Sequence, residues 1–252
     1  MARKALIAEP EMVRTMGYVA CHLEPPMTED NRRSAPSPAS VTDWMRNDWD
    51  ARGGENARYY INTNEHDGFD FALSGCRDAF EVLGLLHKEL RHDMRLLEIG
   101  CGIGRMLQFF GVLFAEVHGI DIAPSMVTQA REYLKKSANV QVHLGDGRTL
   151  TGLPSSHFDL ALSFQVFQHI PDKQVITDYV RDTFRVLRPQ GLFKFLVKTK
   201  PWNGQGPRPD TWNGIEIGRP DIDQWLALDP WRLRSVCDSV DPTKAWVVLQ
   251  KP

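Results

Sequence analysis

Short apolar runs alternate with amphipathic stretches along the chain from residue 96 onwards. The apolar runs predict strands, and stretches with apolar residues every three or four positions predict helices. The expected strands are residues 96–99, 116–121, 140–144, 158–164 and 192–200, and the expected helices are residues 105–114, 124–136 and 172–187. Such alternation favours an α/β fold with a doubly wound, mostly parallel sheet and helices on both faces.

The last fifty residues break this alternation. Residues 201–220 are rich in Pro, Gly and Trp and predict a structured loop, and a short helix is expected at residues 221–228. Residues 231–240 and 244–250 predict two strands that form a hairpin around Asp241-Pro242-Thr243. This antiparallel C-terminal hairpin completes an expected seven-stranded sheet.

The N-terminal part has two different compositions. Residues 1–40 include a polar Pro/Ser-rich stretch that buries little apolar surface, so this segment predicts a disordered tail. The next residues, up to 75, carry Trp44, Trp49, Tyr59, Tyr60, Phe69 and Phe71, which predict helices that cap the domain. A helix at residues 76–90 then leads into the first strand. We therefore expect a single domain at residues 41–252, with a helical cap at 41–90, a core at 94–200, and a substrate loop and hairpin at 201–252.

Composition narrows the possibilities further. The chain has 252 residues and a formal net charge of −2, so no general affinity for polyanions is expected. Its four cysteines are scattered, with no CxxC pair or paired histidine spacing, which favours reduced thiols in a cytoplasmic protein and no metal site. No apolar run approaches the roughly 20 residues of a membrane span, so no membrane association is expected.

The most informative motif follows the first predicted strand. Gly100, Gly102 and Gly104 form a G-x-G-x-G turn, where missing side chains let a bulky ligand lie on the backbone. The dinucleotide-binding fingerprint places its last glycine one residue later. The strand also ends near an acid, Glu98, where an anionic pyrophosphate would be poorly placed. The motif therefore favours a cationic ligand that carries adenosine over NAD.

Polar residues also close the following strands. Asp121 ends the second strand, close to the roughly 20-residue spacing at which an acid reaches ribose hydroxyls, and Ile122 and Met126 are placed to flank a flat adenine. Asp146 ends the third strand, next to Gly147. Alone, Asp121 would be an ordinary solvated acid and Asp146-Gly147 an ordinary turn. Because strand ends meet at one edge of a parallel sheet, together they predict one ligand site.

This arrangement resembles class I S-adenosylmethionine (SAM) dependent methyltransferases of the general small-molecule type. The resemblance covers residues 94–200 well and the flanking residues more loosely. A departure is Gln190, where the family usually has glycine after Arg-Pro. The resemblance implies SAM as cofactor, with the glycine turn under its methionine part, Glu98 near its amino group, Asp121 on the ribose and Asp146 on the adenine. The implied cofactor-binding residues are Glu98, Gly100, Cys101, Gly102, Gly104, Asp121, Ile122, Met126, Asp146, Gly147, Ser163, Tyr59 and Tyr60.

Residues for the methyl acceptor are expected at the end of the fourth strand and in the Trp-rich loop. His169 is the candidate catalytic base for a hydroxyl or acidic carbon, although it would also suit a purely structural place under the strand-to-helix turn. An amine acceptor would need no base. Gln165, His169 and Trp202 are the candidate substrate-binding residues, and Trp202 would equally suit packing at the sheet edge.

The expected function is methyl transfer from SAM to an oxygen, nitrogen or carbon atom of a small molecule. Residues 163–166 lack the Asn/Asp-Pro-Pro-Tyr/Phe motif of base-amino methyltransferases, and the basic residues are interleaved with acids, so RNA or DNA is disfavoured as substrate. A SAM-binding regulatory module without catalysis remains an alternative. An NAD(P)-dependent oxidoreductase would require a different glycine spacing and a Tyr-Lys pair. The oligomeric state is not predicted.

Overall fold

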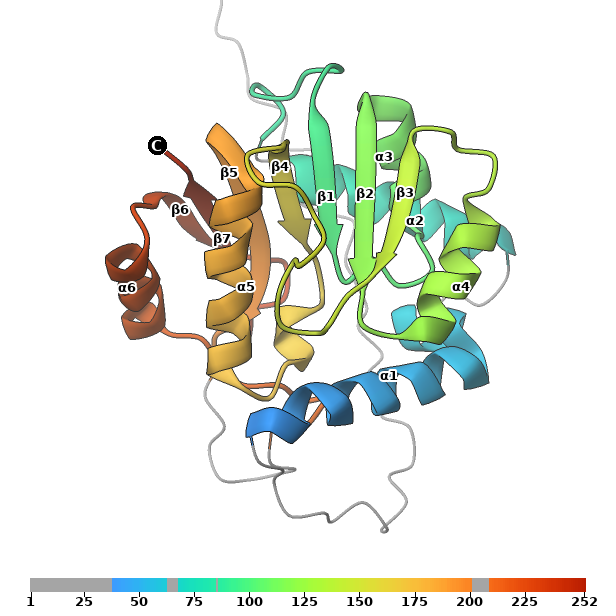
Figure 1. Cartoon of the computed structure of the whole chain (residues 1–252), viewed down its shortest axis with the longest axis horizontal. Coiled ribbons are helices and arrows are strands. Elements are labelled where there is room, and N and C mark those ends of the chain that lie inside the picture. Colours follow the sequence, from blue (N-terminus) through green and yellow to red (C-terminus); the bar gives the residue numbers. More distant parts are fainter. Residues whose placement is uncertain (1–37, 63–67, 85, 201–208) are drawn as a thin grey trace, which may run out of the picture. The chain divides into compact units, whose positions relative to one another are not determined.

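A seven-stranded sheet with strand order β3-β2-β1-β4-β5-β7-β6 forms the centre of the fold (Figure 1). Five strands run parallel, and the C-terminal hairpin pairs antiparallel to β5, as the sequence predicts. The strands are β1 (Arg95–Ile99), β2 (Glu116–Asp121), β3 (Val140–Leu144), β4 (Phe158–Ser163), β5 (Leu187–Lys198), β6 (Arg232–Asp238) and β7 (Lys244–Gln250). The doubly wound sheet with an antiparallel hairpin is therefore confirmed.

The computed structural model describes residues 38–62, 68–84, 86–200 and 209–252. The helices in these ranges are α1 (Pro38–Ile61), α2 (Gly68–Gly84), α3 (Leu107–Leu113), α4 (Pro124–Tyr133), α5 (Lys173–Val186) and α6 (Arg219–Leu228), with a 3-10 turn η1 (Phe167–His169). Most of the predicted tail lies outside the described residues, and α1 begins three residues inside it.

Two hydrophobic cores sandwich the sheet. On one face, α5 and α6 bury side chains such as Val175 and Trp225 against Leu97 and Phe193. On the other face, α2, α3 and α4 pack over β1 and its neighbours, as Figure 1 shows. Helix α1 passes across the ends of the parallel strands and packs beside α4. This position of α1 leaves a space between it and the strand ends.

Helix α2 differs from the predicted helix at residues 76–90, which was wrong in position. The observed helix begins at Gly68 and ends at Gly84. Its buried side includes Ser74, Gly75 and Asp78, so hydrophobic spacing alone could not reveal the first two turns. These polar and small residues face inwards because they contact an arginine that follows the glycine turn.

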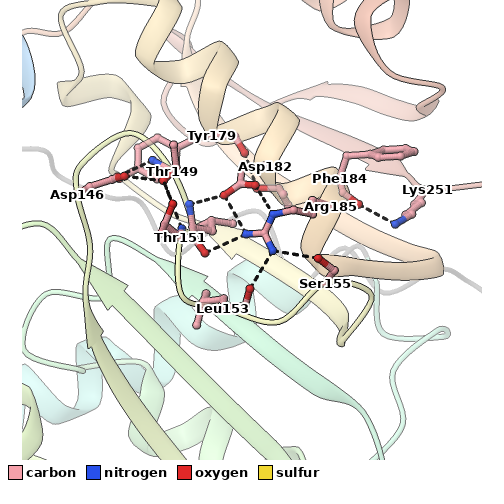
Figure 2. Close-up of polar contacts among 12 residues, drawn as sticks. Asp146, Thr149, Thr151, Leu153, Ser155, Tyr179, Asp182, Phe184, Arg185 and Lys251 are labelled. Atoms are coloured by element: carbon pink, nitrogen blue, oxygen red, sulfur yellow. Dashed lines mark hydrogen bonds and ion pairs between the residues drawn. The ribbon is translucent and has the colours of Figure 1, made fainter. Parts of the chain in front are cut away.

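The connection from β3 to β4, residues 145–157, contains no helix. Instead, the Arg185 side chain of α5 holds it by donating hydrogen bonds to the carbonyls of Leu150 and Leu153, at 3.0 and 2.9 Å (Figure 2). Arg185 also pairs with Asp182, whose carboxylate accepts from the Leu150 amide. Backbone groups that a helix would have satisfied internally are thus bound by one side chain.

Residues 188–191, which lie between the expected helix and the expected strand, belong to β5, because this strand begins directly after α5 at Leu187. Gln190 has φ of +66°, a backbone conformation that favours glycine. Glycine, which the resemblance implies at this position, would adopt this conformation without strain. The strand pairing with β4 shifts register in the same region, so the irregularity is absorbed within the sheet.

Candidate functional site

A pocket lies at the carboxyl ends of the parallel strands, and Met45, Trp49, Tyr60 and Ile61 of α1 contribute to its lining. Ligands of open α/β sheets bind at this edge. Ten of the residues predicted from sequence line it: Glu98, Gly100, Cys101, Gly102, Asp121, Ile122, Met126, Tyr60, Gln165 and His169. The structure therefore brings most of the candidate residues together in one place.

The turn after β1 forms the floor of the pocket with bare backbone. Gly100 and Gly102 have φ values of +74° and +53°, which side chains rarely adopt. A Cβ on Gly100 would lie 2.3 Å from Val166 Cγ2, and a Cβ on Gly102 would lie 2.8 Å from Ile61 Cδ1. Both glycines are thus required by conformation and by space.

Glu98 lines this pocket with a buried carboxyl. Its side chain lies near the end of β1, the residue is 3 % exposed, and Oε2 has no hydrogen-bond partner among the described residues. Burial raises the pKa of Glu98 to about 8, against the opposing effect of the Arg105 guanidinium. An orphaned buried acceptor is costly unless something else satisfies it, so this carboxyl is suited to a ligand that donates hydrogen bonds or carries positive charge.

Arg105 also lines the pocket but is bound elsewhere. Its guanidinium donates to Asp78 Oδ2 at 2.6 Å and to Ser74 Oγ at 2.9 Å, both on α2. Because the arginine is paired with Asp78, its charge does not neutralise the acids of the pocket completely. The ion pair fixes the residues after the glycine turn to α2.

Asp121 joins the glycine turn to the end of β2. Its Oδ2 accepts from the Gly102 amide at 2.8 Å, and its Oδ1 accepts from the Ala123 amide at 3.0 Å. Burial raises the pKa of Asp121, and these backbone hydrogen bonds oppose that effect. Each carboxylate oxygen keeps a further lone pair, so ribose binding remains chemically compatible with this structural role.

Four aromatic rings and an arginine pack together at this pocket, and three of them, Trp49, Tyr60 and His169, line it. Trp49 of α1 and Trp212 each lie 5.2 Å from the His169 ring, centroid to centroid. Tyr60 meets Trp212 edge-on, and the Arg52 guanidinium lies 4.8 Å from the Trp49 ring and 5.1 Å from that of Trp212. We call these five residues the aromatic wall.

His169 is held within this wall by both ring nitrogens. Its Nδ1–H donates to the Trp212 carbonyl at 2.6 Å, which leaves Nε2 to accept from the Gln168 amide at 3.1 Å. Burial lowers the pKa of His169 to about 4, so the imidazole is neutral at physiological pH. A base this weak, with both nitrogens engaged, gives little support to the predicted catalytic role, which stays a prediction.

Comparison with known families agrees with this geometry. Residues 97–195, which contain the glycine turn, Asp121 and the end of β4, match the family described as "Methyltransferase domain". These 99 of the 252 residues are therefore similar to the methyltransferase domain of that family. Among solved structures, phosphoethanolamine N-methyltransferase 1 of Haemonchus contortus superimposes with a TM-score of 0.62 at 14% identity, covering 85% of this chain and 50% of that one. At this identity, the likeness concerns the fold alone.

Curated relatives match only part of this chain. A ubiquinone biosynthesis O-methyltransferase of Xanthomonas oryzae is 32% identical over 109 residues, which are 42% of this chain and 44% of that protein. A 2-methyl-6-phytyl-1,4-hydroquinone methyltransferase of Synechocystis is 29% identical over 133 residues, 52% of this chain and 39% of that protein. The chain thus spans less than half the length of these relatives.

Several of the site residues predicted from sequence lie outside the pocket lining. The Asp146 carboxylate accepts from the Arg148 and Thr149 amides and the Thr149 hydroxyl, within its own turn (Figure 2). Gly147 instead supports the pocket wall, because a Cβ there would lie 2.2 Å from Ile122 Cδ1. Asp146 and Gly147 therefore form a compact turn beside the site, and the adenine contact stays a prediction.

The remaining site residues predicted from sequence contact other parts of the protein. Ser163 is fully buried, and its hydroxyl donates to the Ile99 carbonyl at 3.3 Å. Gly104 packs against Leu134, and Tyr59 meets the Tyr60 ring edge-on behind the lining. Trp202 lies outside the described residues.

Several residues that line the pocket were not predicted from the sequence. They are Met45, Trp49, Ile61, Ile99, Arg105, Met106, Ile120, Phe164, Val166, Ile170 and Tyr179. The aromatic composition of residues 41–75 indicated that this segment packs on the domain, and it could have suggested Trp49. For the apolar members no signal existed, because a side chain that lines a pocket and one that fills a core have the same pattern.

Proposed function

We propose that this protein transfers the methyl group of SAM to a small molecule. The observation that carries the proposal is the buried Glu98 carboxyl, whose Oε2 has no partner among the described residues, beside the bare backbone of Gly100 and Gly102. Asp121 adds a second acid, and the arginine in the lining is already paired with Asp78. A pocket with this charge suits a ligand that carries an ammonium and a sulfonium, rather than a dinucleotide pyrophosphate.

The chain's own residues fit the parts of SAM. The glycine turn offers space for the methionine part, Glu98 faces the place for its ammonium, and Asp121 is available for ribose hydroxyls. Ile122 and Met126 supply apolar contacts for the adenine. When bound, SAM supplies a methyl group on a sulfonium whose leaving group is a neutral thioether.

The protein's task is then to orient an acceptor and to exclude water. In-line transfer requires the reacting atoms to be held about 3 Å apart, without a covalent nucleophile from the protein. Trp49, Tyr60 and His169 of the aromatic wall line the pocket together with Phe164 and Tyr179, and aromatic faces also attract cations. His169 acts here as a positioning residue that joins α1 and the loop at Trp212.

The acceptor is proposed to be a small molecule, with O, N or C as the methylated atom. The enclosed pocket supports this size, and the curated relatives named above methylate small molecules by their names. A location in the cytoplasm is supported by Cys76, Cys101 and Cys237, which are free thiols. Among the described residues, no helix has the length and apolarity needed to cross a membrane.

Calorimetry and a turnover assay test the proposal. We expect SAM and S-adenosylhomocysteine to bind to the full chain while NADH does not. We also expect S-adenosylhomocysteine to be released when SAM is incubated with a member of a metabolite panel. Gly100→Ala should abolish SAM binding, whereas Gly54→Ala, where a Cβ meets nothing within 4 Å, should leave binding unchanged.

Two results would count against the proposal. Absence of SAM binding would reject the whole function. Binding without release of S-adenosylhomocysteine on any metabolite would instead favour a SAM-binding regulatory module. Replacement of His169 by Gln, which keeps a polar side chain, should retain most turnover and the pH profile if this residue only positions the wall. Loss of turnover together with the acid-side limb of the pH profile would instead support the catalytic-base role.

A further inference from the structure

A second cluster of polar side chains lies at the opposite edge of the sheet, where the parallel strands begin (Figure 1). Glu116 and His118 lie in β2 two residues apart, so their side chains share one face of the sheet. His157 immediately precedes β4. Strand β1 runs between β2 and β4, and its first residue is Arg95. The pocket described above uses none of these residues.

Two imidazoles in this cluster converge on a single carboxylate oxygen. His118 Nε2 lies 2.9 Å and His157 Nε2 lies 2.7 Å from Glu116 Oε1. All three atoms lie within 4.8 Å of one another, and among the described residues no other group of His, Cys, Asp and Glu side chains has this geometry. The His118 side chain is buried at 7% exposure, and those of Glu116 and His157 are 28% and 22% exposed, so the group is both held and accessible.

Two histidines with one carboxylate form a common donor set for divalent transition metals. Metal–ligand distances of about 2.0–2.2 Å require ligand atoms slightly further apart than the present hydrogen bonds, so the site needs only small side-chain movements. The open remainder of the coordination sphere can be filled by water at this partly exposed edge.

A second layer of contacts orients the ligands. His143 Nε2 lies 3.1 Å from His118 Nδ1, and the two rings stack at 5.0 Å. Arg95 Nε lies 3.2 Å from Glu116 Oε2, the oxygen that faces away from the imidazoles. Such partners fix the tautomer and the orientation of ligating side chains.

We propose that Glu116, His118 and His157 bind a divalent transition-metal ion, with Zn²⁺ as the representative. Sequence spacing had predicted no metal site, because His157 lies 41 residues from Glu116 in the chain. Coordination would connect the start of β2 to the segment before β4, on either side of β1. The ion therefore has a structural role, far from the methyl-transfer pocket, and the proposal does not depend on the proposed function.

Binding also requires a defined proton movement. The Arg95 guanidinium, which only donates, lies 3.1 Å from His157 Nδ1, so Nδ1 accepts and the ring proton that faces Glu116 is on Nε2. Coordination at Nε2 moves that proton to Nδ1, and Arg95 must release Nδ1. Its side chain is 37% exposed and has room to turn towards solvent while it retains Glu116 Oε2.

The test uses the full chain, stripped of metal with a chelator and titrated with Zn²⁺ in calorimetry. We expect one tight site whose affinity falls at least about tenfold in His157→Ala and in Glu116→Gln, since even outer partners of a metal ligand contribute 10–100-fold. His87→Ala is the matched control, because His87 is exposed and hydrogen-bonds only to the Gly84 carbonyl. This control should bind Zn²⁺ as the wild type does.

X-ray absorption on the Zn²⁺-loaded wild type keeps the test independent of how the variants fold. We expect nitrogen and oxygen neighbours with imidazole scattering. Sulfur neighbours would overturn the proposal, as would unchanged affinity in both ligand variants or no Zn²⁺ binding by the wild type up to 100 μM metal.

Discussion

At the scale of single residues, Glu98 links ligand binding to protonation. With a pKa of about 8, this carboxyl is mostly protonated in the free protein at pH 7. A cation placed against it favours the ionised form, so SAM binding should release a proton below pH 8. We expect SAM affinity to fall as the pH decreases from 8 to 6, by up to about tenfold per pH unit. Calorimetry in buffers of different ionisation enthalpy measures the released proton.

Glu98→Gln is the control for this linkage. The variant should bind SAM more weakly at pH 8 and without proton release from this site. It should also flatten the pH dependence of stability. The raised pKa means that the unliganded fold loses stability as pH rises from the ordinary value of 4.5 to about 8, because the unfolded chain ionises first. Equal proton release in Glu98→Gln and wild type would show that another group is responsible.

Residue type decides which site residues can be predicted from the sequence. Glycines at strand ends are informative, because Gly100 and Gly102 are required by positive φ and close contacts. Acids at strand ends are less informative. Asp121 is the last residue of β2 and reaches the pocket, whereas Asp146 lies two residues beyond the end of β3 and turns its carboxylate onto Thr149. Only the backbone path of the turn decides between these outcomes.

At the scale of elements, the connection between β3 and β4 depends on one side chain of α5. Besides the carbonyls of Leu150 and Leu153, Arg185 donates to Ser155 Oγ at 3.1 Å (Figure 2). Lysine presents one ammonium in place of the forked guanidinium, so Arg185→Lys leaves part of this set unsatisfied. We expect a loss of about 2 kcal/mol in the free energy of unfolding, measured by urea denaturation.

Arg181→Lys is the matched control on the same helix. Arg181 is 55% exposed, and its ion pair with Asp229 is 3.7 Å long. Exposed pairs of this kind contribute little, so the change should stay below about 0.5 kcal/mol. If both variants lost the same stability, the connection would not depend on Arg185.

The positions of helices and strands could be predicted where the spacing of apolar residues marks them. The four strands that precede β5 follow the predicted bounds within two residues, since each is a short apolar run between polar turns. Helix α2 was misplaced because its buried side is made of Ser74, Gly75 and Asp78 around Arg105. Such polar packing becomes visible only when the partner's position is known. The absence of a helix between β3 and β4 has the same cause, a side chain from a later element.

At the scale of the whole molecule, the doubly wound sheet follows from general rules of strand connection. The position of α1 over the pocket does not. Strands alternating with helices restrict the parallel part to a doubly wound sheet. The position of α1 across the strand ends depends on contacts between distant segments, such as the hydrogen bond from the Ser125 amide to Asp50 at 2.6 Å. These contacts have no sequence pattern of their own.

Because α1 and the strand ends form opposite walls of one pocket, a ligand there should stabilise both together. Met45 and Trp49 of α1 and Gly102 after β1 all line the pocket. We expect SAM at 100 times its dissociation constant to stabilise the fold by about 2.7 kcal/mol. Hydrogen exchange should slow at α1 and at the Gly102 amide, which already donates to Asp121.

The C-terminal hairpin provides the internal control in the same exchange experiment. Neither β6 nor β7 contributes a residue to the pocket. The exchange rates of their amides should therefore change only where exchange occurs through global unfolding, which SAM makes rarer. We therefore expect slower amide exchange both in α1 and in the glycine turn, which lie on opposite sides of the site. Protection of the turn alone, with α1 exchanging as before, would mean that α1 does not close over the cofactor and that the acceptor enters beneath it freely.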